Sequence, residues 1–170
     1  MIGTVLLGFV LLFALSAVFF DAKDSDRGSR ISAILAGLAA IGASAVLFAI
    51  ILSNDFSYSY VASYSSIDLP LVYKISAFWA GQQGSFLLWL LIHTLVGTYM
   101  VCTNRLTATG RIIYHLLTVM LVILVFIKSP FAPAEHIMPD GYGMNPLLQD
   151  PWMAVHPPII FIGYALLAVP

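Results

Sequence analysis

One histidine near the end of the chain stands before two prolines: His156 is followed by Pro157 and Pro158, and then by an apolar run that begins at Ile159. Proline disfavours the helical conformation in the residue before it, and it fits the first turn of a helix. We therefore expect a helix to begin at the prolines, with His156 just outside it. A neutral imidazole beside an apolar surface can ligate a metal, and haem iron is the metal centre that suits such a surface.

The histidines also have plainer explanations. A histidine before a proline pair can be an ordinary helix-start residue. His93 and His115 fall inside apolar segments, where ionisable side chains are uncommon and often functional; interhelical hydrogen bonding is the structural explanation for both, and proton transfer is the functional one. His136, next to Glu135, is expected to be a solvated surface residue.

Tryptophans flank a short glycine motif in the middle of the chain. Trp79 and Trp89 lie on either side of Gly81-Gln82-Gln83-Gly84. They are either interfacial anchors around a turn or one wall of a flat apolar platform on which a planar ligand stacks. In the second case the glycines would let the ligand approach the backbone.

The composition places the chain in a membrane. Of its 170 residues, 61% are hydrophobic and 9% are charged, whereas soluble domains carry about 25% charged residues. The net charge of −1 gives no indication of a nucleic-acid partner, so none is expected. The single cysteine, Cys102, excludes an internal disulfide, and the sequence has no Cys-x-x-Cys-His motif for covalent haem.

Apolar runs separated by polar turns must position these residues. Their lengths predict an all-α, polytopic helical membrane protein with four complete transmembrane helices and a truncated fifth. The expected spans cover about residues 2–20, 31–52, 86–102, 112–127 and 159–170, and the last is too short to cross. We also expect a short interfacial helix from Leu71 to Trp79, which ends at a break formed by residues 80–85.

Basic residues predict the orientation, because short loops rich in Lys and Arg stay in the cytoplasm. Five basic residues follow the first and third expected spans and two lie in the other loops: Lys23, Arg27, Arg30, Arg105 and Arg111 against Lys74 and Lys128. This asymmetry predicts an N-terminus outside. The outer face would then hold segments 53–85 and 128–158, and any chemistry at His156 would be extracytoplasmic.

Two ordered blocks of motif residues run from about Tyr58 to the end of the chain. They comprise Leu69-Pro70, Tyr73-Lys74 and Trp79-x-Gly81-x-x-Gly84-Ser85-x-Leu87-Leu88-Trp89, and then Asp140-Gly-x-Gly143-x-Asn145-Pro-Leu-Leu-Gln149-x-Pro151, His156-Pro157-Pro158 and Gly163-Tyr164. Together they resemble the N-terminal part of the CcmF/NrfE-type cytochrome c haem lyases. The chain is therefore expected to be a single membrane-embedded portion, residues 1–170, of such a lyase.

The resemblance implies a function in cytochrome c maturation. Family members lie in the bacterial or archaeal cytoplasmic membrane or the mitochondrial inner membrane. They take haem b from a haem chaperone and, with other maturation subunits, assist its attachment to apocytochrome c on the outer face. Their first outer histidine ligates the haem iron axially and matches His156, so the resemblance implies that role for His156, with Trp79, Trp152, Asn145 and Gln149 around the haem.

The rest of the family's haem site has no match in these 170 residues. The chain is therefore expected to hold one end of that site, to need the remaining C-terminal part of the lyase, and not to be a complete enzyme by itself. Two alternatives stay open. One is a proton- or solute-translocating subunit that uses His93 and His115; the other is a non-catalytic assembly subunit that docks partner helices through small residues such as Ala36, Ala40 and Ser44.

Overall fold

The computed structural model describes residues 1–169, and the elements in this part of the chain are helical. They are, in order, α1 (Ile2–Ala22), α2 (Asp26–Leu52), α3 (Ser59–Tyr64), α4 (Leu71–Ala77), α5 (Gln82–Cys102), α6 (Ala108–Ile127), the 3-10 helix η1 (Pro146–Leu148) and α7 (Pro151–Leu167). Four of them, α1, α2, α5 and α6, are long and apolar enough to cross a membrane, and α7 is a shorter apolar helix. The expected all-α, multi-pass membrane fold is confirmed.

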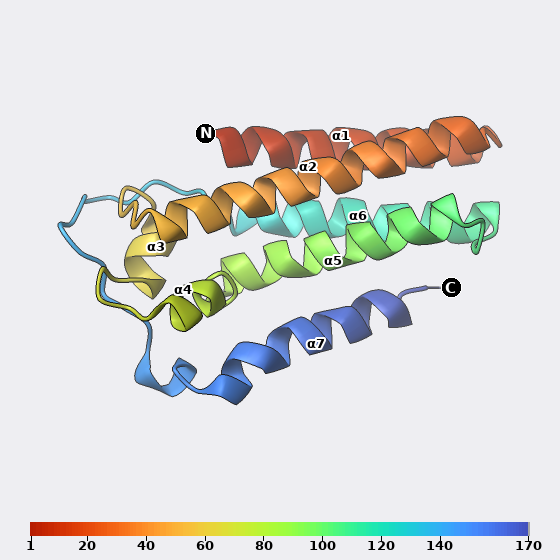
Figure 1. Cartoon of the computed structure of the whole chain (residues 1–170). Helices are drawn as coiled ribbons and strands as arrows, with labels where there is room; N and C mark the ends of the chain where they lie inside the picture. Colours follow the sequence, from red (N-terminus) through yellow and green to blue (C-terminus); the bar gives the residue numbers. More distant parts are fainter. Residues whose placement is uncertain (170) are drawn as a thin grey trace.

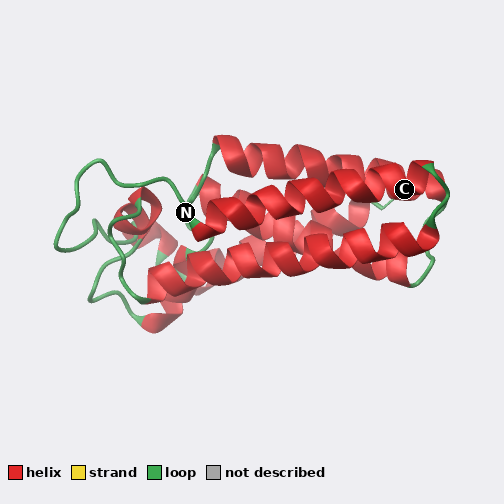
Figure 2. Ribbon diagram, turned by 90° about the horizontal axis from the view of Figure 1, so that it is seen from above, coloured by secondary structure: helices red, strands yellow, loops and turns green. Residues whose placement is uncertain are grey.

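The four long helices form a bundle, and α7 runs along one side of it (Figure 1). Helix α1 packs on α2 and α6, α2 also packs on α5, and α5 packs on α6 and α7. Tight turns join the helices at one end of the bundle, and long connections gather at the other (Figure 2). We call the first the turn end (residues 23–25 and 103–107) and the second the loop end (residues 53–81 and 128–150).

Small residues allow α2 to pack closely inside the bundle. Ala36, Ala40 and Ser44 are all buried. Gly37 faces Thr98 of α5, whose hydroxyl donates a hydrogen bond to the α2 backbone at 2.9 Å. The small-residue face is therefore used within this bundle and is not free to dock partner helices.

A buried group of charges closes the turn end. Arg111, in the first turn of α6, donates from Nε to Asp21 Oδ1 at 2.8 Å and from Nη2 to Asp26 Oδ1 at 2.7 Å. The Asp21 side chain is fully buried, and His115 Nε2 lies 3.6 Å from Asp21 Oδ2. We expected Asp21 and Arg111 in polar turns; instead they belong to α1 and α6, because each charge is neutralised by a partner inside the protein.

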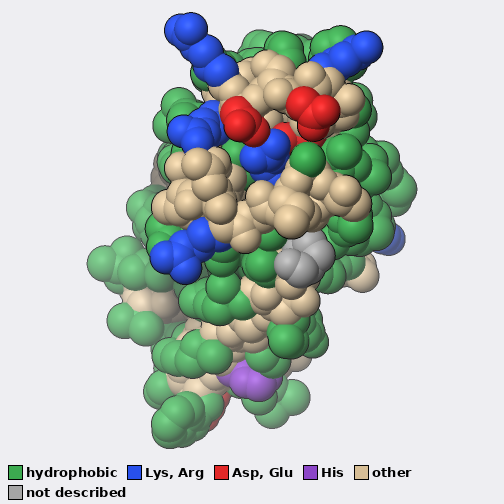
Figure 3. All heavy atoms as spheres, turned by 90° about the vertical axis from the view of Figure 1, so that its right-hand side faces the viewer, with side chains coloured by type: hydrophobic (Ala, Val, Ile, Leu, Met, Phe, Trp, Pro, Cys, Tyr) green, Lys and Arg blue, Asp and Glu red, His purple; other side chains and the backbone are tan. Residues whose placement is uncertain are grey.

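The surface of the turn end carries most of the basic residues of the chain. Figure 3 looks onto this end and shows Lys and Arg side chains around it, with acidic side chains between them. The loop end holds only Lys74 and Lys128, and Lys74 donates to Asn54 Oδ1 at 2.8 Å and to Ile67 O at 3.1 Å. The two ends of the bundle therefore differ in charge as well as in the length of their connections.

Around α4, one helix boundary and one additional helix differ from expectation. Helix α4 lies within the expected range, but α5 begins at Gln82, so residues 82–85 form its first turn and not a break. Helix α3 was not expected in a segment rich in Ser and Tyr. It forms because its buried face, Tyr60, Val61 and Ala62, packs into the core.

Candidate functional site

Helix α7 begins at Pro151 and not at Pro157. Asp150 is its N-cap and accepts a hydrogen bond from Trp152 N at 2.8 Å, and Pro151 occupies the first helical position. Pro157 and Pro158 lie inside the helix. The expectation that His156 stands just outside the helix is wrong. The sequence does contain the correct signal, an N-cap aspartate followed by proline.

Inside α7, Trp152 and His156 lie one helical turn apart and share a face. Both side chains are exposed, Trp152 at 79%. Together with Met153, Val155 and Ile159 they line a cavity of about 330 Å³. Within residues 1–169 no hydrogen bond occupies the imidazole of His156, so its ring nitrogens are available to a ligand.

Trp79 lines a neighbouring cavity between α4 and α7. This cavity has a volume of about 360 Å³, and its lining includes Trp79, Val155 and Ile159. Val155 and Ile159 also line the cavity at His156. An apolar wall therefore continues from His156 to Trp79, although the two side chains do not line the same cavity.

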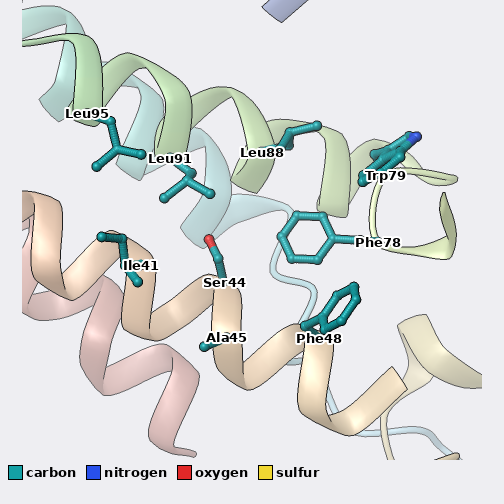
Figure 4. A pocket seen from close by; sticks show the side chains of 9 residues that line it. All are labelled: Ile41, Ser44, Ala45, Phe48, Phe78, Trp79, Leu88, Leu91 and Leu95. Atoms are coloured by element: carbon teal, nitrogen blue, oxygen red, sulfur yellow. The ribbon is translucent and has the colours of Figure 1, made fainter. Parts of the chain in front are cut away.

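A third cavity, of about 360 Å³, lies between α2 and α5 (Figure 4). Its lining is almost entirely hydrocarbon: Ile41, Ser44, Ala45, Phe48, Phe78, Trp79, Leu88, Leu91 and Leu95. The Ser44 hydroxyl points into the space between the two helices and has no hydrogen-bond partner in the described chain. Trp79 lines both this cavity and the one along α7, so it stands between the bundle and α7.

Asn145 and Gln149 fold the segment that leads into α7. Asn145 Oδ1 accepts a backbone N–H of η1 at 3.0 Å, and Gln149 Nε2 donates to Met144 O at 3.0 Å. The Tyr73 hydroxyl of α4 donates to Gln149 O, also at 3.0 Å. The lining of the His156 cavity includes neither Asn145 nor Gln149. What the structure shows for both is a role in ordering the loop that carries the N-cap of α7.

The preceding glycine motif docks the same loop onto α3. Tyr142 N donates to Ala62 O at 2.8 Å, and Gly143 N donates to Ser65 O at 3.1 Å. Gly143 has φ +79°, a conformation that favours glycine. A Cβ at Gly141 would lie 2.1 Å from Ser65 O. These contacts between distant segments could not be read from the sequence.

The space beside Gly81 and Gly84 is occupied by other parts of the protein. A Cβ at Gly81 would lie 2.4 Å from the Tyr64 ring, and one at Gly84 would lie 1.8 Å from Phe78 O. The Tyr60 hydroxyl accepts from Gly81 N at 3.2 Å and donates to the α4 backbone at 2.9 Å. Burial raises the pKa of Tyr60 above its usual range, which keeps that donor protonated. The glycines therefore serve the junction of α3, α4 and α5, and ligand approach to the backbone is not their role.

The other aromatic and histidine candidates join helices. Trp89 of α5 stacks on Phe161 of α7 with ring centroids 6.0 Å apart. His93 Nε2 donates to Tyr114 O on α6 at 3.2 Å, because a carbonyl oxygen can only accept. Interhelical hydrogen bonding is therefore confirmed for His93. His136 is exposed, as expected.

The fold and the site together define a class: a multi-pass helical membrane protein that presents one free imidazole on an exposed apolar helix face. The family model described as "Cytochrome C assembly protein" matches residues 79–170, more than half of the chain. The chain belongs to this cytochrome c assembly family.

Its relatives are cytochrome c biogenesis proteins. The chain is 33% identical over 169 residues to cytochrome c-type biogenesis protein CcmF of Escherichia coli. This alignment covers 93% of the chain and 26% of the length of that protein. The chain is also 32% identical, over 185 aligned positions, to cytochrome c-type biogenesis protein NrfE of Haemophilus influenzae. That alignment covers 95% of the chain and 28% of the length of the relative. The resemblance to the CcmF/NrfE type is confirmed.

A solved structure shares the fold. The structure titled "Cytochrome c Heme Lyase CcmF" matches 99% of this chain and 28% of its own chain, with a TM-score of 0.82 and 28% sequence identity. The chain thus spans about a quarter of the length of the relatives that it matches.

Proposed function

We propose that this chain carries one end of the haem site of a cytochrome c haem lyase, and that it presents haem b at the outer face of the membrane for attachment to apocytochrome c. The observation that supports this most is the pairing of Trp152 and His156 on the exposed face of α7. The imidazole offers a nitrogen to the iron, and the indole offers an aromatic face to the porphyrin.

The residues at the loop end fit haem better than a metal ion bound by side chains alone. In the part of the chain that the structure describes, there is no group of three or more His, Cys, Asp or Glu residues that could hold a metal ion. The four porphyrin nitrogens already hold the iron of a haem, so the protein needs to supply only one further ligand. One exposed histidine with apolar and aromatic neighbours meets that need.

The contribution of this chain is positioning. Haem is the cargo, and the apocytochrome supplies the thiols, so the chemistry of attachment belongs to them. In this proposal His156 is the axial ligand, Trp152 and Trp79 line the apolar wall, and Asn145 and Gln149 order the loop before α7. The partners are a haem chaperone, apocytochrome c, other maturation subunits of the membrane and the C-terminal part of the lyase.

The proposal includes an orientation. Five of the seven Lys and Arg residues belong to the turns and helix termini at the turn end (Figure 3), and basic residues in short loops stay in the cytoplasm. We therefore place the turn end in the cytoplasm of a bacterial or archaeal cell, or in the mitochondrial matrix. The loop end and His156 then face outward, where cytochromes c are matured.

The test is His156→Ala in the full-length lyase, with His136→Ala as the matched control in the same outer segment. We expect the first variant to insert into the membrane and to lose the absorption spectrum of bound haem. The control should keep that spectrum, because His136 lies outside the α7 cavity. An unchanged haem spectrum in His156→Ala would contradict the axial-ligand role.

A further inference from the structure

We infer that Tyr114 is a positioning residue for His156: its hydroxyl ties α7 to α5 and α6 and thereby sets which face α7 turns outward. This inference rests on the proposed function, because it concerns the helix that carries the proposed haem ligand. It is carried by the contacts that hold α7 against the rest of the protein.

Helix α7 is attached mainly through α5. The two helices pack together, and Trp89 of α5 contacts Phe161 and Tyr164 of α7. Apolar contacts are non-directional, so by themselves they fix the rotation of a helix weakly. The directional contact is a hydrogen bond of 3.1 Å from the Tyr114 hydroxyl to Ala165 O. Within residues 1–169, no other hydrogen bond joins α7 to another helix.

The Tyr114 side chain is buried against α5, so its hydroxyl has a defined position. The ring is 1% exposed, and it stacks on the His93 ring with centroids 4.0 Å apart and an angle of 2°. Gly97 leaves room beside it, since a Cβ there would lie 2.6 Å from the ring. The hydroxyl has one hydrogen, which His93 O, at 3.1 Å, shares with Ala165 O. One hydroxyl thus contacts a carbonyl oxygen of α5 and one of α7. It thereby fixes how these two helices face each other.

The position of Ala165 relative to His156 connects this bond to the proposed site. The two residues are nine positions apart (165 − 156 = 9), which at 3.6 residues per turn is about two and a half turns. They therefore lie on opposite faces of α7, and Ala165 is fully buried while His156 is exposed. The bond that holds Ala165 toward the bundle also directs His156 away from it.

The experiment removes this hydroxyl and keeps the ring: Tyr114→Phe in the full-length lyase. The first readout is independent of haem. Cysteines replace Val72 of α4 and Ile159 of α7, which line the same cavity, in a Cys102→Ser background, and the rate of disulfide cross-linking is measured in membranes. Because one hydrogen bond is lost, we expect the cross-linking rate to fall by about fivefold.

The second readout is the axial ligation of the haem, followed by its low-spin absorption and electron paramagnetic resonance signals in the same protein without the added cysteines. We expect Tyr114→Phe to lower the low-spin fraction. Gly97→Ala should act in the same direction, because the new methyl group displaces the Tyr114 ring. The matched control is Tyr99→Phe on α5, because Tyr99 is 55% exposed and its hydroxyl makes no hydrogen bond to α7 within residues 1–169.

The outcomes separate the two proposals. If Tyr114→Phe behaves as Tyr99→Phe in the cross-linking or in the haem signals, the positioning role is overturned and the axial-ligand role of His156 stands. If His156→Ala leaves the haem signals unchanged, the proposed function fails, and so does a positioning role toward haem, even where cross-linking shows that Tyr114 orients α7.

Discussion

The two ends of the bundle are stabilised by different means. The turn end is short and closed by ion pairs, in which Arg111 joins Asp21 of α1 to Asp26 of α2. The loop end is long and is held by backbone hydrogen bonds between distant segments, such as Tyr142 N to Ala62 O. Charged side chains are buried at the first end, and large aromatic side chains are exposed at the second, such as Tyr142 and, in the helix that follows it, Trp152.

The residues that stabilise the helix bundle therefore differ from the residues that are proposed to bind a ligand. Buried ion pairs hold helix ends in one arrangement, because an unpaired buried charge is costly. A surface that receives a flat apolar molecule must instead keep apolar side chains exposed, and such exposure is sustained only if the backbone beneath it is well ordered. The comparison predicts large stability effects at the turn end and at the glycine junction, and small stability effects with large functional effects at His156.

The largest expected effect is at the turn end. Asp21→Ala leaves the buried Arg111 without its fully buried partner, and breaking a buried ion pair costs about 3–5 kcal/mol. Asp26→Ala is the control: its side chain is 65% exposed, so the expected loss is at most about 1 kcal/mol. Thermal unfolding of the full-length protein in detergent measures both. Equal losses for the two variants would contradict the buried-cluster account.

Gly84→Ala tests the junction at the loop end. The new methyl group would lie 1.8 Å from a backbone oxygen, Phe78 O, so α4 and α5 must move apart. Overpacking of this kind costs about 1–3 kcal/mol. The matched control is Gly163→Ala on α7. There the new Cβ would meet no other part of the protein within 4 Å, and alanine is the better helix former. A neutral Gly84→Ala in the same unfolding measurement would show that the junction is not tightly packed.

A smaller loss is expected at the start of α7. Asp150→Ala removes the side chain that caps the helix, at 2.8 Å from Trp152 N, and loss of such a cap costs about 1 kcal/mol. The effect is local, so hydrogen exchange of the amides in residues 152–156 should become faster. Asp68→Ala, at an exposed aspartate of the loop end, should leave this exchange as it is. The capping role is refuted if both variants exchange alike.

His156→Ala is expected to have the smallest effect on stability. The side chain is exposed and makes no hydrogen bond within residues 1–169, so the change in unfolding free energy should stay within about 0.5 kcal/mol. Haem retention should nevertheless be lost. A large fall in the unfolding temperature would mean that His156 has a structural role, and the loss of haem would then need another explanation.

Local sequence patterns predicted the four long helices, because the length and hydropathy of a span are properties of consecutive residues. They could not show the pairing of Asp21 with Arg111, since 90 positions separate the two residues. The same holds for the docking of residues 141–143 onto α3. Such contacts depend on how the helices are arranged in three dimensions, which one sequence does not reveal.

For the candidate site, the choice of residues remains a prediction from the sequence, and the structure corrects their expected geometry. The prolines after His156 were interpreted as a helix start, whereas Asp150 and Pro151 mark it. With the start placed correctly, the spacing of four residues between Trp152 and His156 puts both on one face. The position of Trp79 in the neighbouring cavity, and those of Asn145 and Gln149 in the loop before α7, required the structure.

The two prolines inside α7 have a consequence for its hydrogen bonding. Neither Pro157 nor Pro158 has a backbone N–H, so the carbonyl groups of Met153 and Ala154 receive no helical hydrogen bond. Both sides of the proline pair are held to the rest of the protein: Gln149 O, just before the helix, accepts from the Tyr73 hydroxyl, and Ala165 O accepts from the Tyr114 hydroxyl. A backbone carbonyl without its helical partner still requires a donor. The carbonyl oxygens of Met153 and Ala154 are therefore acceptors on the helix itself for water or for a bound molecule.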